Sequence, residues 1–255
     1  MKLSAIKNVP LFAFLVGYLV KINGDRKKMM QLRAEGKFAE EKEVIRKIYH
    51  NLCSDACKYV GVEVRVQGRE NLPPADEPVV FVCNHQSYSD VVAFGAVMKD
   101  RQISFIAKES LSKIPFYGKL IQDMRGIFIN GLDARSAVEV MRTGNKYLKE
   151  GFNMVIFPEG RRSLGPEMGS FKHGSLQLAC RAGVRVVPCV INPAWECYET
   201  KGYPQPGVID FAILPPVATK DVPKKEWGAL METIEGQVRS KLEELQAARA
   251  AEERK

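Results

Sequence analysis

The stretch Pro78-Val-Val-Phe-Val-Cys83 runs directly into Asn84-His-Gln-Ser-Tyr-Ser-Asp90, and it decides the predicted fold. Its first part is a short run of β-branched and aromatic residues, which predicts a buried β-strand. The strand delivers the imidazole of His85, and the following turn returns the carboxylate of Asp90. A base can lie beside its orienting partner in such a segment, so the spacing indicates an active site.

A purely structural interpretation exists for the same residues. Ser87 and Asp90 fit the S/T-x-x-D/E pattern that caps the start of a helix. Asp90 would then bind backbone N–H groups only, and short motifs have many accidental matches. This stretch alone leaves both interpretations open.

A second motif, Phe157-Pro-Glu-Gly-Arg-Arg-Ser163, follows another apolar run, which ends abruptly at proline and glycine. The adjacent Arg161 and Arg162 carry planar groups that match phosphate oxygens. Glu159 can fix an arginine or accept a hydrogen bond, and Gly160 provides a hinge. The alternative is an ordinary solvated basic loop.

Together the two motifs resemble the N-H-x-S-x-x-D and F-P-E-G-T-R-S signatures of the glycerolipid acyltransferases, in the same order and spacing. The resemblance covers about residues 62–217. Three further stretches resemble other blocks of the family: Lys108-Glu-Ser-Leu-Ser-Lys-Ile-Pro-Phe-Tyr-Gly118, Arg125-Gly-Ile-Phe-Ile-Asn130 and Val186-Val-Pro-Cys-Val-Ile191.

The resemblance implies a mixed β-sheet flanked by helices and the transfer of a fatty acyl group. The donor would be an acyl thioester, either acyl-CoA or acyl carrier protein. The acceptor would be the free hydroxyl of 1-acylglycerol-3-phosphate (lysophosphatidate), which gives phosphatidate in phospholipid biosynthesis, or alternatively the hydroxyl of another lysolipid. Transfer would be direct, without an acyl-enzyme, and no cofactor or metal ion is implied.

An alcohol is a poor nucleophile at neutral pH, so a base must take its proton as it attacks the acyl carbonyl. We expect His85 to be this base and Asp90 to hold its tautomer and stabilise the imidazolium. The acceptor phosphate is expected to bind at a site formed by Glu159, Gly160, Arg161, Arg162, Lys108 and Arg125.

Two residues depart from the family pattern. Gly131 stands where the family usually has an arginine that is assigned to the acceptor phosphate, and Arg161 stands where it usually has threonine. One hypothesis is that positive charge has moved between loops, with Arg125, Arg135 or Arg161 reaching the same anion.

Composition fits one substantial domain plus an appendage, with 255 residues of which 45% are hydrophobic. The net charge of +8 favours an anionic partner: an acidic membrane, a phosphorylated substrate or nucleic acid. The six cysteines lack C-x-x-C or metal-ligand spacing, which indicates buried thiols in a reducing compartment. Of the other two histidines, His50 is expected to be structural, and His173 is a weaker candidate base.

The N-terminal residues 9–22 are strongly apolar and are flanked by Lys2, Lys7 and the basic residues 26–28. The uncharged stretch is shorter than the roughly 20 residues that span a bilayer, which favours insertion into one leaflet. The alternative is a buried core helix. A second helical pattern, from about residue 26 to 59, suggests a hairpin with the first.

This hairpin would form a basic, apolar platform at an anionic membrane surface. The predicted location is the cell membrane, peripheral or monotopic on its cytoplasmic face. The predicted domains are the helical membrane anchor, residues 1–60, the α/β acyltransferase domain, residues 61–246, and a charged tail, residues 247–255.

Strand-like runs alternate with helical patterns beyond residue 60, which predicts a layered α/β domain. The expected strands are 62–66, 79–83, 103–107, 126–129, 154–157, 184–191 and 208–214. The expected helices are 88–98, 109–121, 134–151, 171–182 and 224–246.

The sequence pattern bears on three classes of function. An acyltransferase is favoured, while Gly131 keeps open an inert lipid-binding membrane homologue. A nucleic-acid-binding protein should interleave exposed aromatic and basic residues, but the aromatic residues here fall mainly in apolar runs, so no nucleic-acid partner is expected. The absence of G-x-S-x-G, P-loop and G-x-G-x-x-G motifs argues against serine hydrolases, P-loop nucleotidases and dinucleotide enzymes.

Overall fold

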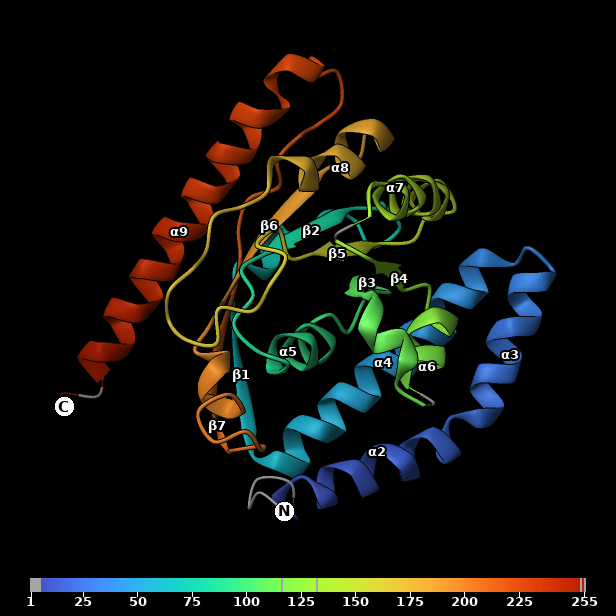
Figure 1. Ribbon diagram of the computed structural model, residues 1–255, viewed down its shortest axis with the longest axis vertical. Helices are drawn as coiled ribbons and strands as arrows, with labels where there is room; N and C mark the ends of the chain where they lie inside the picture. The colour runs from blue at the N-terminus through green and yellow to red at the C-terminus, as the bar shows by residue number, and fades with distance from the viewer. Residues whose placement is uncertain (1–5, 116, 132, 253, 255) are drawn as a thin grey trace.

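The computed structural model describes residues 6–115, 117–131, 133–252 and 254, and Lys2 and two positions of the predicted tail, 253 and 255, lie outside them. A sheet of seven strands, in the order β1-β7-β6-β2-β5-β3-β4, forms the centre of the described part (Figure 1). Only β6 and β7 pair antiparallel, so the sheet is mixed, as the resemblance implied. The strands are β1 Val62–Gln67, β2 Val80–Cys83, β3 Ser104–Lys108, β4 Ile127–Ile129, β5 Met154–Ile156, β6 Val186–Asn192 and β7 Gly207–Ile213.

The predicted strands are all present, and each boundary lies within two residues of its predicted place. Two predicted helices differ. Within residues 171–182, a 3₁₀ turn, His173–Leu176, precedes the short helix α8, Gln177–Ala182. Residues 109–121 divide into a 3₁₀ turn, Glu109–Lys113, and α6, Tyr117–Asp123. Pro115 lies at the division, and proline has no backbone N–H to continue a helix.

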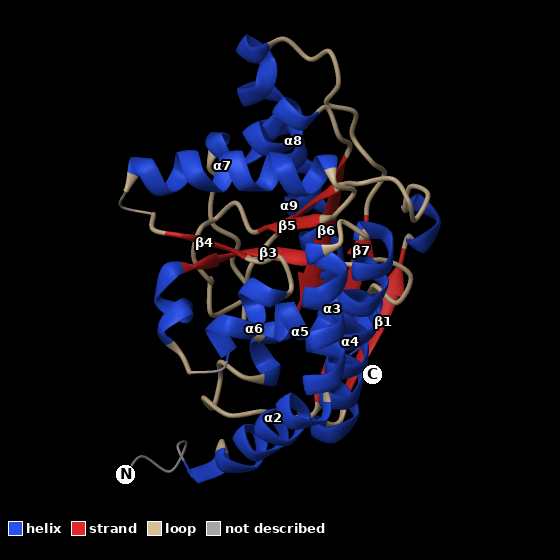
Figure 2. Cartoon of the chain, turned by 90° about the vertical axis from the view of Figure 1, so that its right-hand side faces the viewer, coloured by secondary structure: helices blue, strands red, loops and turns tan. Residues whose placement is uncertain are grey.

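Helices cover both faces of the sheet (Figures 1 and 2). Successive residues of a strand face opposite sides. Phe81 and Cys83 of β2 therefore join one hydrophobic cluster with α4 and α5, whereas Val80 and Val82 join a second cluster with α7, α8 and α9. These helices are α4 Phe38–Val60, α5 Ser89–Val97, α7 Ala134–Lys149, α8 Gln177–Ala182 and α9 Trp227–Glu252.

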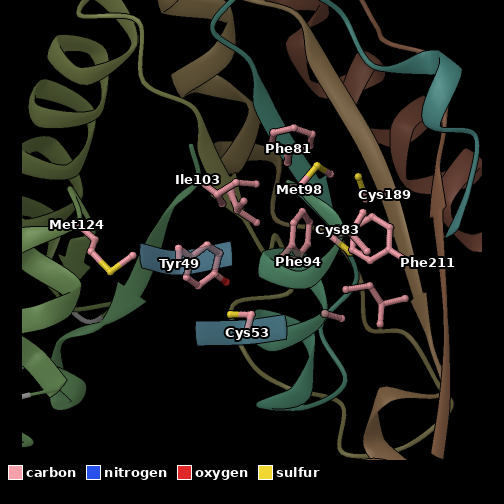
Figure 3. Close-up of a cluster of buried hydrophobic side chains, with 14 of the residues drawn as sticks. Tyr49, Cys53, Phe81, Cys83, Phe94, Met98, Ile103, Met124, Cys189 and Phe211 are labelled. Carbon is pink, nitrogen blue, oxygen red and sulfur yellow. The ribbon is translucent and has the colours of Figure 1, made fainter. Parts of the chain in front are cut away.

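Phe94 fixes α5 on the sheet (Figure 3). Its ring lies edge-on to Phe211 and Phe81, with centroids 4.9 and 6.0 Å away. On the other side of α5, Gly95 allows α4 to approach closely, because a Cβ there would lie 2.3 Å from the Sγ of Cys53. The start of α5, which carries Asp90, is thereby held at the carboxyl end of β2.

The N-terminal region differs from the single helix predicted for residues 26 to 59. It forms α3, Asn23–Ala34, and α4, with α2, Val9–Lys21, preceding them at an angle (Figure 1). The division falls at Gly36, whose φ of +70° lies in the left-handed region that glycine adopts easily. The hairpin therefore turns between α3 and α4, not between the apolar segment and the charged one.

The predicted C-terminal tail is helical for most of its length, because α9 continues to Glu252. The sequence suggested fraying from residue 247, but this part of α9 is tied to the rest of the molecule. Arg249 pairs with Glu196 at 3.2 Å, and Glu252 pairs with Arg65 at 3.3 Å.

Candidate active site

His85 follows β2 at the carboxyl end of the parallel strands. Its Nδ1 lies 2.6 Å from Oδ2 of Asp90, and its ring stacks on Phe157 with centroids 4.0 Å apart. Because Asp90 is an acceptor, the neutral imidazole carries its proton on Nδ1 and leaves the lone pair of Nε2 available. Nε2 makes no hydrogen bond to any residue that the structure describes.

Asp90 combines the two roles that the sequence left open. Its Oδ2 accepts the backbone N–H groups of Gln86 and Ser87, at 2.7 and 2.9 Å, as well as the proton of His85. The carboxylate is fully buried, and these donors satisfy Oδ2, whereas Oδ1 has no hydrogen-bond partner among the described residues. Asp90 therefore holds both the turn and the imidazole.

Asn84 and Gln86 anchor this turn to the neighbouring strand β6. The amide of Asn84 exchanges two hydrogen bonds of 2.9 Å with the backbone of Ile191, and Oε1 of Gln86 accepts from the N–H of Ala194 at 3.1 Å. Sequence reasoning assigned no role to either residue. The sequence did contain a sign of this role, because amide side chains that directly follow a buried strand need hydrogen-bond partners inside the protein.

The Glu159 loop lies against the His85 turn through its backbone. Ser163 N donates to His85 O at 2.8 Å, and Oε1 of Glu159 accepts from His85 N at 2.7 Å. Oε2 of Glu159 accepts from Gly169 N at 2.8 Å. Burial raises the pKa of Glu159, and these two N–H groups partly offset the rise. Glu159 thus braces two loops and pairs with no described arginine.

Gly160 turns the chain directly after Glu159, with a φ of +69°. Its N–H donates to Phe157 O at 3.1 Å, which closes the turn. Arg161 is exposed and lines a cavity of about 410 Å³ together with Lys172 and Ser170. Lys172 was not among the predicted site residues, although it lies beside His173 in the sequence.

Arg162 lies apart from Arg161, between Tyr88 and Glu199. Its Nη1 donates to Oε1 of Glu199 at 2.5 Å, and its guanidinium lies 3.7 Å from the ring centroid of Tyr88. The remaining N–H groups of Arg162 make no hydrogen bond to a described residue. Glu199 was missed by sequence reasoning, because no local pattern connects it with a site 37 residues away.

Lys108 lies where the parallel strands have their carboxyl ends (the carboxyl edge), and Arg125 lies where they have their amino ends (the amino edge). Lys108 is the last residue of β3 and is exposed at the carboxyl edge, on the same side as His85. Arg125 precedes β4 and therefore lies at the amino edge. There it is buried and pairs with Glu41 at 2.6 Å and Glu150 at 3.0 Å. The structure therefore places Arg125 away from His85 and pairs its charge inside the protein, which does not favour the predicted role in acceptor binding.

Gly131 lies just beyond β4 at the carboxyl edge. A Cβ added there would meet no described atom within 4 Å, so the position has room for a longer side chain. The other two histidines lie elsewhere: Nδ1 of His50 binds Gly95 O at 2.9 Å, and His173 is exposed and lies 4.0 Å from Glu232 of α9.

Comparisons with known proteins agree with this geometry. Residues 63–192 match the acyltransferase family. A 1-acyl-sn-glycerol-3-phosphate acyltransferase of Chlamydomonas reinhardtii is 36% identical over 154 residues, which are 60% of this chain and 46% of that protein. The chain therefore spans less than half of the algal protein's length.

Two further similarities cover more of each molecule. The 1-acyl-sn-glycerol-3-phosphate acyltransferase alpha of Mus musculus is 32% identical over 69% of this chain and 63% of its own. The crystal structure of a 1-acyl-sn-glycerophosphate acyltransferase from Thermotoga maritima superimposes with a TM-score of 0.78 and 28% identity. That likeness covers 96% of this chain and 98% of the other.

Proposed function

The chain belongs to the acyltransferase family, and we propose that it transfers a fatty acyl group from an acyl thioester to the free hydroxyl of lysophosphatidate, forming phosphatidate. The family match confirms the resemblance that the two sequence motifs indicated. Relatives that carry the name of this activity support lysophosphatidate as the acceptor.

The pair formed by His85 and Asp90 carries the proposal. Nε2 of His85 takes the proton of the acceptor hydroxyl while the hydroxyl oxygen attacks the thioester carbonyl. Asp90, 2.6 Å from Nδ1, stabilises the imidazolium that forms. The C–S bond then breaks, and the leaving thiolate takes the proton back from the imidazolium. Base and acid are thus the same residue.

Direct transfer is supported by the state of the nearby serines. Ser87 is fully buried, and its Oγ accepts the N–H of Ser89 at 3.1 Å. Oγ of Ser163 donates to Gly165 O at 2.9 Å. Neither hydroxyl is paired with the imidazole, as a serine nucleophile would be.

Arg162 and Lys108 are proposed to hold the acceptor phosphate. Both lie at the carboxyl edge, where His85 also lies. Glu199 and Tyr88 hold the guanidinium of Arg162 in place but occupy only part of its donors, so a phosphate can bind the rest. A phosphate fixed there would keep the hydroxyl near the base and raise its effective concentration.

The proposed location is the surface of the membrane, reached through α2. No helix among the described residues has the length and apolarity that a membrane crossing requires. Val9, Phe12, Val16 and Val20 expose 58%, 68%, 41% and 74% of their surface along one side of α2, so this helix is not a core helix. With the exposed lysines at 7, 21, 27 and 28, this stripe fits insertion into one anionic leaflet.

Free thiols at all six cysteines are compatible with the reducing, cytoplasmic side of the membrane.

The apolar stripe of α2 can be tested by the double substitution Phe12→Asp and Val16→Asp. We expect it to abolish binding to anionic vesicles in sedimentation. Val138→Asp, at another exposed valine on α7, should leave binding unchanged.

The function is tested by acyl transfer in anionic lipid vesicles, with lysophosphatidate or lysophosphatidylcholine as acceptor and acyl-CoA or acyl carrier protein as donor. The proposal expects phosphatidate from the wild-type protein and none from His85→Ala. A preference for lysophosphatidylcholine would show another lysolipid as the substrate. If no combination of acceptor and donor gave a product, the protein would be an inert lipid-binding homologue.

A further inference from the structure

Arg161, the first arginine of the Glu159 loop, is not explained by the acceptor site. Arg162 is paired with Glu199 and covered by Tyr88, whereas Arg161 makes no ion pair with any described residue. Lys172 likewise has no acidic partner among the described residues, and both cations line the cavity of about 410 Å³. The chain thus leaves two positive charges uncompensated around one hollow.

The hollow is built to take an anion. Gly160 lets the ammonium of Lys172 approach the turn, because a Cβ at Gly160 would lie 2.6 Å from Nζ. Glu159 also lines the cavity, but it is 7% exposed and each of its oxygens already accepts a backbone N–H group. Ser170 adds a hydroxyl at the rim. Two exposed cations therefore outweigh one buried and hydrogen-bonded carboxylate.

The aromatic residues next to the cavity and next to His85 pack on different faces of the sheet. His85 stacks on Phe157, which packs against the cluster of α4 and α5. Phe171, next to Lys172, is buried in the cluster that includes α9, and its N–H donates to Glu235 of α9 at 3.1 Å. Glu159 joins the two places, because it lines the cavity and also accepts the N–H of His85, whereas His85 itself does not line the cavity. A group bound between Arg161 and Lys172 would thus lie beside the catalytic turn but not on the imidazole.

The two substrates of the proposed reaction both carry phosphate, but at different distances from the reacting atoms. The acceptor phosphate is a short glycerol chain away from the hydroxyl, which suits Arg162. The donor phosphate lies a whole pantetheine arm away from the thioester, which requires a separate site. Acyl-CoA and acyl carrier protein share this phosphopantetheine phosphate.

Resting on the proposed function, we propose that Arg161 and Lys172 bind the phosphopantetheine phosphate of the acyl donor. Arg161 supplies the planar fork and Lys172 the point charge. The cavity positions the donor from the α9 side of the sheet, while Arg162 positions the acceptor from the α5 side. The two adjacent arginines divide the two substrates between them.

The test combines substitutions in the protein with removal of the phosphate from the donor. Arg161→Gln and Lys172→Gln are each expected to raise the KM for acyl-CoA about tenfold, as for the loss of a charge-assisted hydrogen bond. The KM for lysophosphatidate should not change. With an S-acyl-N-acetylcysteamine donor, which has no phosphate, both variants should match the wild type. Arg181→Gln removes an exposed arginine of α8 and is the matched control.

Calorimetric titration with free coenzyme A and with holo-acyl carrier protein gives a readout that needs no acyl transfer. Weaker binding by Arg161→Gln and Lys172→Gln than by Arg181→Gln would support the site, even if the wild type transferred no acyl group to lysophosphatidate. Unchanged binding of both donors would overturn it. A rise in KM for lysophosphatidate instead, or an equal loss with the truncated donor, would also overturn it.

Discussion

The two edges of the parallel strands both carry arginines near acids, but they use the charges differently. At the amino edge, Arg125 donates to both oxygens of Glu41, at 2.9 and 2.6 Å, and to Glu150 at 3.0 Å. At the carboxyl edge, Arg162 shares one donor with Glu199, and Arg161 has no acidic partner among the described residues. The arginine charge at the amino edge is paired inside the protein, whereas the arginines at the carboxyl edge keep donors that can bind a ligand.

The ion pairs at the amino edge have a structural role, because they hold helices together. Arg33 pairs with Glu41 at 2.7 Å, and Arg26 pairs with Asp123 at 2.5 Å, which ties α3 to α4 and to α6. Glu41 and Asp123 are both almost fully buried, so each needs its partners. The difference teaches that an arginine beside an acid indicates a binding site only when some of its donors are left without partners.

The largest effect is expected from Asp90→Asn. An asparagine at this position can offer an N–H group to Nδ1 of His85, which would favour the tautomer that cannot act as a base. We expect kcat to fall by about 10³- to 10⁴-fold, as in other His-based triads. The measurement is kcat at saturating donor and acceptor.

Asp123→Asn is the matched change at the amino edge. It should lower the free energy of unfolding in urea and leave kcat per folded molecule unchanged. The comparison of the two edges is contradicted if Asp90→Asn and Asp123→Asn change kcat and the free energy of unfolding in the same way.

The next effect concerns stability, through Arg125→Met. Removing the guanidinium leaves Glu41 buried beside only Arg33, so the free energy of unfolding should fall by about 3–5 kcal/mol. Activity per folded molecule should not change. A rise in the KM for lysophosphatidate, in protein shown to be folded, would return Arg125 to the acceptor site that the sequence suggested.

A smaller effect is expected from Arg162→Ala. Loss of the phosphate contact should lower kcat/KM for lysophosphatidate by about 10- to 100-fold and reduce turnover as well, because the hydroxyl is no longer held near the base. The measurement is the transfer rate at limiting acceptor. An unchanged rate would remove Arg162 from the site.

The smallest effect is expected from Gly131→Arg. The new side chain enters open space, so the fold should be unaffected and acceptor affinity should change by less than about threefold, as for most surface substitutions. A large gain in affinity for lysophosphatidate would show that the carboxyl edge lacks a phosphate ligand. The other cations there would then not replace the family arginine.

Much of the fold followed from local patterns. Runs of β-branched residues identified every strand of the sheet, and the alternation with helical patterns identified its layers. The break at Gly36 and the helical end of α9 were missed, because the first depends on one left-handed residue and the second on ion pairs to Glu196 and Arg65.

The site was predictable where its residues are neighbours in sequence. His85 and Asp90 lie on one turn, so their pairing could be expected from spacing. Glu199 could not, because it meets Arg162 only through the tertiary fold. The position of Arg125 could have been expected, since a residue that precedes a parallel strand lies at the edge opposite to one that follows it.

The most direct test of the central claim is the single-turnover rate of phosphatidate formation by His85→Ala and wild-type protein in the same vesicles. The account predicts a fall of at least about 100-fold, the loss of a general base, with the unfolding midpoint unchanged and no acylated wild-type protein at any time. Equal rates in the two proteins would contradict it.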